Sequence, residues 1–378
     1  MNSTQHALTV EVLDRATAIS SLPSELDDLA TRALEPNVFK ESLMFIPALQ
    51  LLDVEIPLWV ACVRGPSGVL LGVVPLVRQP VRKGLPSMVL RNWVHRYCSL
   101  GTPLLDAAYA RQALEALATW IDSGKAPAGG LQWLRVAWDG PFAQLVRQTF
   151  ASSESWNMDV LTKRRALLER TQDTKSPISG KHAKELRRLE RRLAAGGAVT
   201  YEVMQPADDW KAWYDDFLRL EASGWKGTEG SAIHSKPEDA EFFRRVLERA
   251  HAGGQLQLMR LAVAGKPVAM KLNLRADGGS YSLKIAHDEN YAQYSPGVLL
   301  ELFNIKVFAE EPDNIRWMDS CAEANHPMID RLWSGRREIA TVSLARHGTL
   351  LRTFVSLRPV IRRLKHAWPV GNYQWKRR

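Results

Sequence analysis

The sequence predicts an α/β protein built from two mixed-sheet lobes. Three observations support this class: an ordinary globular composition, an alternation of helix-like and strand-like segments, and a polar stretch near the middle. Of the 378 residues, 46% are hydrophobic and 24% are charged, which is typical of folded domains. Such a length favours two domains, or one fold with two similar halves. The polar stretch, 162–180, ends in Ser, Pro and Gly. It separates a first lobe, 1–165, from a second lobe, 176–347, and a tail, 348–378.

The first lobe alternates helix and strand. A helical stretch lies near 24–34, and 58–79 contains two apolar strands joined by a Gly-Pro-Ser-Gly turn. An amphipathic helix follows over 108–122, and another strand over 131–139. This pattern indicates a mixed α/β unit.

The second lobe is clearer and follows the order β-α-α-β-β-β-α-β-α-β. Its elements have recognisable boundaries, such as Pro296 in the first turn of a long helix and the Gly pair that ends 238–254. A basic helix over 181–197 precedes the first of these strands. Its leucines recur at helical spacing, with Arg and Lys around the other faces.

Positive charge gathers in two segments of a chain whose formal net charge is +9. Between Lys163 and Arg192 there are eleven Lys or Arg against four acids, and between Arg358 and Arg378 there are seven and no acid. Such segments attract nucleic acid, anionic lipid or phosphorylated substrates, although a solvated surface explains the same charge. The tail sets apolar residues at helical spacing among its basic ones. This suits peripheral contact with an anionic membrane, or packing against the domain.

Other features favour a cytoplasmic protein. We find no run of roughly 20 apolar residues that could span a membrane, and the first residues do not resemble a signal peptide. The three cysteines are widely spaced, which fits neither a disulfide framework nor a metal site. We therefore expect a reduced compartment and no metal.

Three segments carry a resemblance to a known family. LRLEASGWKGTEGSA (218–232), YSLKIAHDENYAQYSPGVLLE (281–301) and MDSCAEANHPMIDRLW (318–333) resemble the GNAT-superfamily acyltransferases, in particular the FemAB-like and CelD-type (cellulose biosynthesis) acetyltransferases. The resemblance implies a tandem GNAT-like fold whose first lobe is degenerate. It also implies an N-acyltransferase that moves acetyl from acetyl-CoA to an amino group of a sugar or of an envelope or exopolysaccharide precursor.

The same resemblance indicates a donor site. In the family, pantetheine lies between the fourth and fifth strands, and the next helix points its N-terminus at the pyrophosphate. Here that helix starts at Ser295, Pro296, Gly297 and Val298, although a helix cap started by proline explains the same residues. The family's phosphate loop has two spaced small residues, whereas this segment offers one glycine. This departure puts coenzyme A in doubt.

Acceptor-side candidates come from separate segments, and we expect them to share one cleft. A base must take the proton of the attacking amine, and ion pairing is the alternative role for each charged residue. His326 could move protons near neutral pH or cap a helix. The catalytic candidates are Glu221, Lys284, Asp288 and Asp319, and the substrate-binding candidates are Trp225, Lys226 and His326.

Two other functions stay open. A FemAB-like aminoacyltransferase would use aminoacyl-tRNA, with the basic helix over 181–192 as the tRNA contact. A non-catalytic scaffold of a polysaccharide-synthesis complex is the third possibility.

Overall fold

The computed structural model describes residues 8–80, 88–126, 128–151, 153–170, 180–223, 233–349, 352–353 and 355–357. The sequence predictions for Trp225, Lys226 and nearly all of the basic tail lie outside the described residues. Within the described part of the chain, no helix has the length and apolarity needed to cross a membrane.

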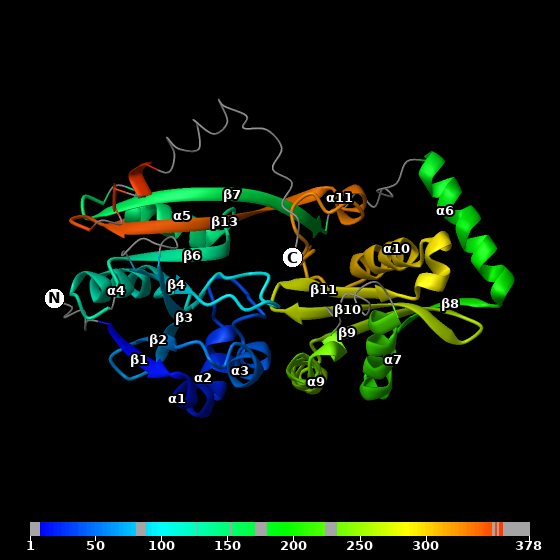
Figure 1. Ribbon diagram of the computed structural model, residues 1–378, viewed down its shortest axis with the longest axis horizontal. Helices are drawn as coiled ribbons and strands as arrows, with labels where there is room; N and C mark the ends of the chain where they lie inside the picture. The colour runs from blue at the N-terminus through cyan, green and yellow to red at the C-terminus, as the bar shows by residue number, and fades with distance from the viewer. Residues whose placement is uncertain are drawn as a thin grey trace.

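Each half of the chain is a run of short helices and strands (Figure 1). The first half contains β1 (Thr9–Asp14), α1 (Arg15–Ser21), α2 (Pro23–Ala30), α3 (Ser42–Leu51), β2 (Leu58–Arg64), β3 (Leu70–Pro80), β4 (Met88–Asn92), β5 (Leu104–Leu105), α4 (Ala110–Asp122), β6 (Gly130–Ala137), α5 (Pro141–Phe150) and β7 (Trp156–Glu169). The second half contains α6 (Gly180–Leu193), η1 (Ala194–Gly196), β8 (Val199–Val203), α7 (Trp210–Ser223), η2 (Ile233–Ser235), α9 (Pro237–Ala252), β9 (Leu256–Val263), β10 (Lys266–Ala276), β11 (Gly279–His287), η3 (Glu289–Tyr294), α10 (Pro296–Ala309), β12 (Trp317–Asp319), α11 (Ile329–Leu332) and β13 (Gly335–Arg346).

The second half, from β8 to β13, follows the predicted order of strands and helices, which confirms that expectation. Its boundaries have local causes. Proline begins both α9 and α10, where a missing N–H costs nothing. Gly265 and Gly278 form the turns of the β9–β10 and β10–β11 hairpins at positive φ, a conformation that glycine adopts without strain.

The described strands form one thirteen-stranded mixed sheet with the order β1-β2-β3-β4-β6-β13-β7-β12-β11-β10-β9-β8, and β5 pairs with β3. The two halves of the chain begin alike, each with a strand, then helices, then a meander of three strands. These elements are β1, α1–α3 and β2–β4 in the first half, and β8, α7 and α9, and β9–β11 in the second. In each half the last strand of the meander pairs in parallel with a later strand. These pairs are β4 with β6 and β11 with β12. The α/β class with two mixed-sheet lobes is thereby confirmed.

The two halves exchange their last strands. β7 ends the first half but pairs with β12 of the second, and β13 ends the second half but pairs with β6 of the first. β13 also pairs with β7 along its whole length, from Gly335 to Arg346. The lobes are therefore joined by backbone hydrogen bonds, and the boundaries 1–165 and 176–347 remain predictions.

Helices cover both faces of the sheet. On one face α1–α3 of the first half and α7 and α9 of the second share a continuous apolar core, and α3 packs directly on α9. On the other face α4 and α5 cover the first lobe, while α6 and α10 cover the second. Burial of Leu186, Leu189 and Leu193 against this core explains why the basic helix α6 docks by its leucine stripe.

Candidate functional site

Two parallel strands of the second lobe separate shortly after they meet. β11 and β12 pair only from Gly279 to Tyr281 on the β11 side. β12 then ends, whereas β11 continues to His287. The register between β10 and β11 shifts by one residue at Leu283, which is a β-bulge. Bulges bend a strand and re-aim its groups, so the end of β11 presents an open edge.

A cavity of about 420 Å³ lies at this open end. Its walls come from the end of β11, the start of α10, the end of α7 and the loop before α11. The lining residues are Leu220, Glu221, Ile285, Ala286, His287, Glu289, Ala292, Ser295, Pro296, Gly297, Val298, His326 and Met328.

The N-terminus of α10 opens onto this cavity. Ser295 takes the left-handed conformation at φ 53°, Pro296 occupies the first turn, and no side chain caps the helix. A Cβ on Gly297 would meet only His287 and Ile285, at 3.8 and 3.9 Å. The glycine therefore keeps space open where the helix dipole favours a negative group.

A buried ion pair forms the wall beside α7. Glu221 is 3% exposed, and its Oε1 accepts a hydrogen bond from Lys284 Nζ at 3.0 Å. Its Oε2 accepts one from the backbone N–H of Ile233 at 2.9 Å. The structure thus brings these two predicted residues together and places the Glu221 carboxylate against the cavity.

Tyr97 of the first lobe lies against Lys284 behind this wall, a contact that the sequence did not indicate. Lys284 Nζ lies 5.3 Å from the Tyr97 ring centroid and 5.5 Å from that of Phe243, within the range of cation–π attraction. The Tyr97 hydroxyl donates to Asp239 of α9 at 2.6 Å. Tyr97 comes from a loop more than a hundred residues earlier, so no local signal could have identified it.

His326 and Asp288 have local hydrogen-bonding roles. His326 Nδ1 accepts the backbone N–H of Ile329 at 3.3 Å, so the imidazole supports the start of α11 and also lines the cavity. Asp288 caps η3 by accepting the N–H of Asn290 at 3.0 Å. Asp288 does not line the cavity.

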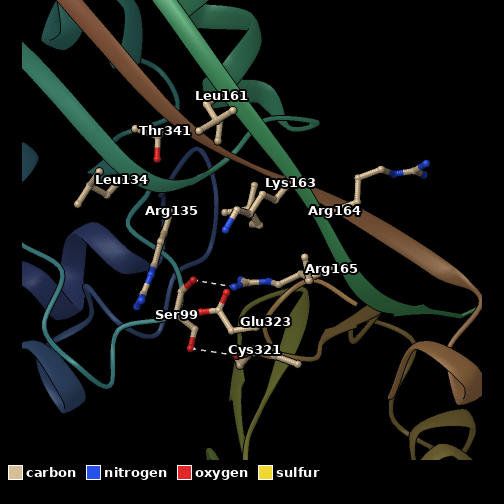
Figure 2. A pocket seen from close by; sticks show the side chains of 14 residues that line it. Ser99, Leu134, Arg135, Leu161, Lys163, Arg164, Arg165, Cys321, Glu323 and Thr341 are labelled. Carbon is tan, nitrogen blue, oxygen red and sulfur yellow. Dashed lines mark hydrogen bonds between the residues drawn. The ribbon is translucent and has the colours of Figure 1, made fainter. Parts of the chain in front are cut away.

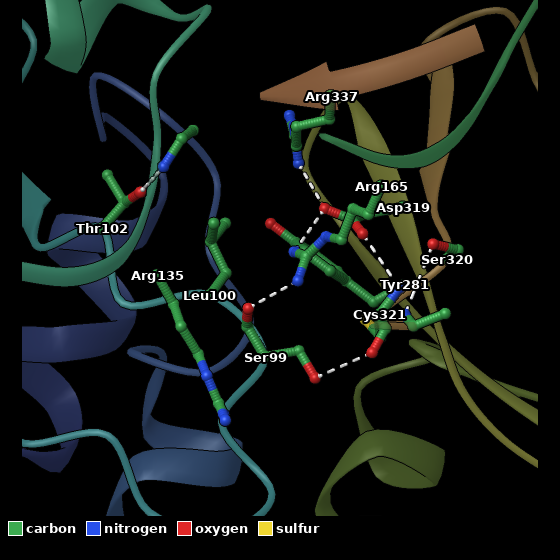
Figure 3. Close-up of polar contacts among 12 residues, drawn as sticks. Ser99, Leu100, Thr102, Arg135, Arg165, Tyr281, Asp319, Ser320, Cys321 and Arg337 are labelled. Atoms are coloured by element: carbon green, nitrogen blue, oxygen red, sulfur yellow. Dashed lines mark hydrogen bonds and ion pairs between the residues drawn. The ribbon is translucent and has the colours of Figure 1, made fainter. Parts of the chain in front are cut away.

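Asp319 belongs to a separate buried cluster (Figure 3). It is 0% exposed, and its Oδ2 accepts from Arg165 at 2.7 Å and from Arg337 at 2.9 Å. Burial would raise the pKa of the Asp319 carboxyl, but the two guanidiniums outweigh it and hold the pKa below its ordinary value. Asp319 therefore ties β12 to the exchanged strands β7 and β13.

The predicted donor and acceptor residues are thus divided. Seven of the described ones line the cavity or bond to its lining, and two do not. The first group is Glu221, Lys284, Ser295, Pro296, Gly297, Val298 and His326, and the second is Asp288 and Asp319. Their catalytic and binding roles remain predictions.

The corresponding opening in the first lobe is filled. After β4 and β6 part, the Asn92 amide donates to the carbonyls of Gly101 and Leu134 at 2.9 and 3.1 Å. The N–H of Gly101 donates to the Arg135 carbonyl at 2.7 Å. A Cβ on Gly101 would lie 2.1 Å from the Leu134 oxygen, so this segment is wedged directly between the strands.

Residues 180–326 match a family model described as an acetyltransferase (GNAT) domain. No curated protein has a sequence that matches this chain significantly.

Solved structures show the same fold at low sequence identity. The crystal structure of FemX is 13% identical with a TM-score of 0.53, and the match covers 92% of this chain and 99% of FemX. The C-terminal domain of a putative lysylphosphatidylglycerol synthetase from Agrobacterium fabrum is 10% identical with a TM-score of 0.53, covering 92% and 96%. A conserved protein of unknown function from Bacteroides thetaiotaomicron is 13% identical with a TM-score of 0.52, covering 85% and 97%. The match over 180–326 and the open strand pair within it lead to one conclusion: residues 180–326 form an acetyltransferase domain of the GNAT type, and the chain is an acyl-transfer enzyme.

Proposed function

We propose that the chain is an N-acyltransferase that uses acetyl-CoA and acylates an amino group of a sugar or of an envelope polysaccharide precursor. One observation carries this proposal. The open edge of β11, the uncapped N-terminus of α10 and a buried carboxylate meet at one cavity. These features supply an anion site, backbone donors and a proton acceptor, which amide formation from a thioester requires.

The donor half of the cavity suits an acyl-CoA. The N-terminus of α10 favours the pyrophosphate, and the space beside Gly297 lets the ligand approach the backbone. The bulge at Leu283 leaves one residue of β11 outside the pairing with β10. Beyond Tyr281 the edge of β11 no longer pairs with β12, and N–H groups on that edge can polarise the thioester carbonyl and stabilise the oxyanion that forms there.

The acceptor half centres on Glu221. This carboxylate takes the proton of the attacking amine, directly or through one water. Lys284 and the Ile233 N–H fix its orientation through their hydrogen bonds. Tyr97 and Phe243 hold the Lys284 ammonium in place from the other side.

Calorimetric titration with acetyl-CoA tests the donor assignment. Gly297→Val places methyl groups in the space that the ligand needs, and we expect affinity to fall about tenfold or more, which corresponds to about 1.4 kcal/mol. The fold should tolerate the change, since a Cβ meets only ordinary contacts there. Gly180→Val is the matched control, because its Cβ enters open space at the start of α6. Equal affinity in both variants and the parent would reject this donor site.

The second candidate function is aminoacyl transfer from tRNA. FemX and the putative lysylphosphatidylglycerol synthetase domain have this fold, and α6 presents exposed arginines along its outer face. Replacement of Arg187, Arg188, Arg191 and Arg192 by Gln would then abolish tRNA binding and flatten its salt dependence. We expect weak binding that these changes do not affect, since an acyl-CoA enzyme does not need that face.

A further inference from the structure

A second cavity, of about 260 Å³, lies where the lobes exchange strands (Figure 2). Strands β6, β7 and β13 form its walls, together with Ser99 of the first lobe and the loop after β12. It is distinct from the acyl-transfer cavity, with which it shares no lining residue. The side chains that determine its chemistry are Arg135, Lys163, Arg165 and Glu323, whereas Arg164 points away from the opening.

The lining is cationic. Three basic side chains and one carboxylate face the opening, and one of the three, Arg165, is already paired with Asp319 behind the wall. Within the described ranges, neither Lys163 nor Arg135 has an ion-pair partner. Arg135 donates one hydrogen bond, to the Cys98 carbonyl at 2.8 Å, and Figure 2 shows it and Lys163 beside the same opening.

Arg165 is the buried base of this cavity. Only 6% of the residue is exposed. One terminal nitrogen donates to Asp319 and the other to the Ser99 carbonyl at 2.7 Å. Its Nε is buried and has no hydrogen-bond partner among the residues that the structure describes. A buried donor left unpaired is unfavourable, and an acceptor atom that reached it from the cavity would relieve that cost.

Two wall residues take an uncommon backbone conformation. Arg135 and Cys321 both have φ 54°, the left-handed region that side chains other than glycine, Asn and Asp seldom adopt. Such strain tends to gather at functional sites. In this cavity one such residue, Arg135, lies in one wall, and the other, Cys321, lies in the loop after β12 at the opposite wall.

This loop also links the two cavities. Ala324 lines the cationic cavity and His326 lines the acyl-transfer cavity. Two residues of extended chain span at most about 7 Å. A molecule bound in the cationic cavity therefore lies within reach of the acyl-transfer cavity.

We propose that the cationic cavity binds a phosphate or diphosphate group of the acceptor. That the bound molecule is the acceptor rests on the proposed function, but the anion site itself follows from the lining alone. Guanidinium and ammonium groups bind phosphate through charge-assisted hydrogen bonds. The lining has no aromatic residue, so it lacks the platform on which nucleic-acid bases stack. A sugar phosphate or a phosphate head group fits this chemistry.

Direct binding of inorganic pyrophosphate, measured by calorimetry, tests the anion site. We expect saturable binding that weakens as ionic strength rises. Lys163→Gln should lower the affinity about tenfold or more, because it removes one charge-assisted hydrogen bond. Arg135→Asn should also lower the affinity about tenfold or more. Asn is chosen because it tolerates the left-handed backbone conformation of this position. Lys266→Gln, which removes an exposed charge at the start of β10, is the control and should bind like the parent.

Further arms identify the source of the phosphate and separate this proposal from the proposed function. A nucleotide-diphosphate sugar and vesicles of phosphatidic acid in phosphatidylcholine serve as probes of a soluble and a lipid-linked acceptor. Lys163-dependent binding of either supports the site and assigns its source. Acetyl-CoA affinity should be unchanged in Lys163→Gln. Pyrophosphate binding that is absent, or equal in the Lys163, Arg135 and Lys266 variants, overturns the anion site even where acetyl-CoA still binds.

Discussion

Asp319→Asn should destabilise the protein more than any exposed substitution. The parent carboxylate is fully buried and bonds two guanidiniums, Arg165 and Arg337, whose side chains are 7% and 14% exposed. Asparagine keeps the shape but leaves both cations without a counter-charge. Breaking a buried pair in this way costs about 3–5 kcal/mol, against a total stability on the order of 5–15 kcal/mol.

Urea unfolding at neutral pH measures the effect. Asp313→Asn is the matched control, because Asp313 pairs with Arg170 at 3.3 Å while fully exposed. Such exposed changes usually stay within about 0.5 kcal/mol. If the free energies of unfolding of the two variants differ by less than about 1 kcal/mol, the buried cluster does not hold the lobes together.

The pH dependence gives an independent check on Asp319. Its pKa is lowered on folding. Its contribution is therefore present above the unfolded value of about 3.9 and is lost as pH falls through the folded value. The gap between parent and Asp319→Asn should shrink below about pH 4.

Two further predictions concern carboxylates. Glu221→Gln keeps an oxygen for the Ile233 N–H but cannot accept a proton, so amine acylation should fall about 10²–10⁴-fold with acetyl-CoA affinity unchanged. Unaltered turnover would clear Glu221 of the role of base. Burial raises the pKa of Glu41 to about 7. The folded state therefore holds a proton that the unfolded state releases near pH 4.3, and stability falls as pH rises between these values. Glu41→Gln should flatten this slope in urea titrations from pH 5 to pH 8, and parallel slopes would contradict the assignment.

The sequence predicted the second-lobe elements because their signals are local. Proline at a first turn and glycine at a tight turn act within a few residues. It could not predict that Lys284 pairs with Glu221. Without the bulge at Leu283, Ser282 and Lys284 would share one face of β11. With it, Ser282 bonds Lys271 on the α10 face, and Lys284 reaches Glu221 on the α7 face. Nothing in the residue types marks that bulge.

The strand exchange was also invisible, because strand partners are chosen over long sequence separations. Asp319 ends β12, but the two arginines that bind it come from β7 and β13. The expectation of a degenerate first lobe came from the family resemblance, and the structure offers a physical reason for it. Gly101 allows the segment after β4 to enter the gap between β4 and β6, where Asn92 bonds both sides of it.

The same exchange explains how a lobe with a filled gap can still take part in the function. Its loop after β4 carries Tyr97 to the Lys284 ammonium and Ser99 to Arg165. Its strands β6 and β7 carry Arg135 and Lys163 to the cationic cavity. The cationic cavity is therefore bordered by residues of both halves, while at the other cavity Tyr97 lies against Lys284, the partner of the lining residue Glu221. Because β7 and β13 cross between the halves, separating the lobes would break the sheet itself. The first lobe thus supports the surroundings of both cavities, although the open strand pair lies in the second.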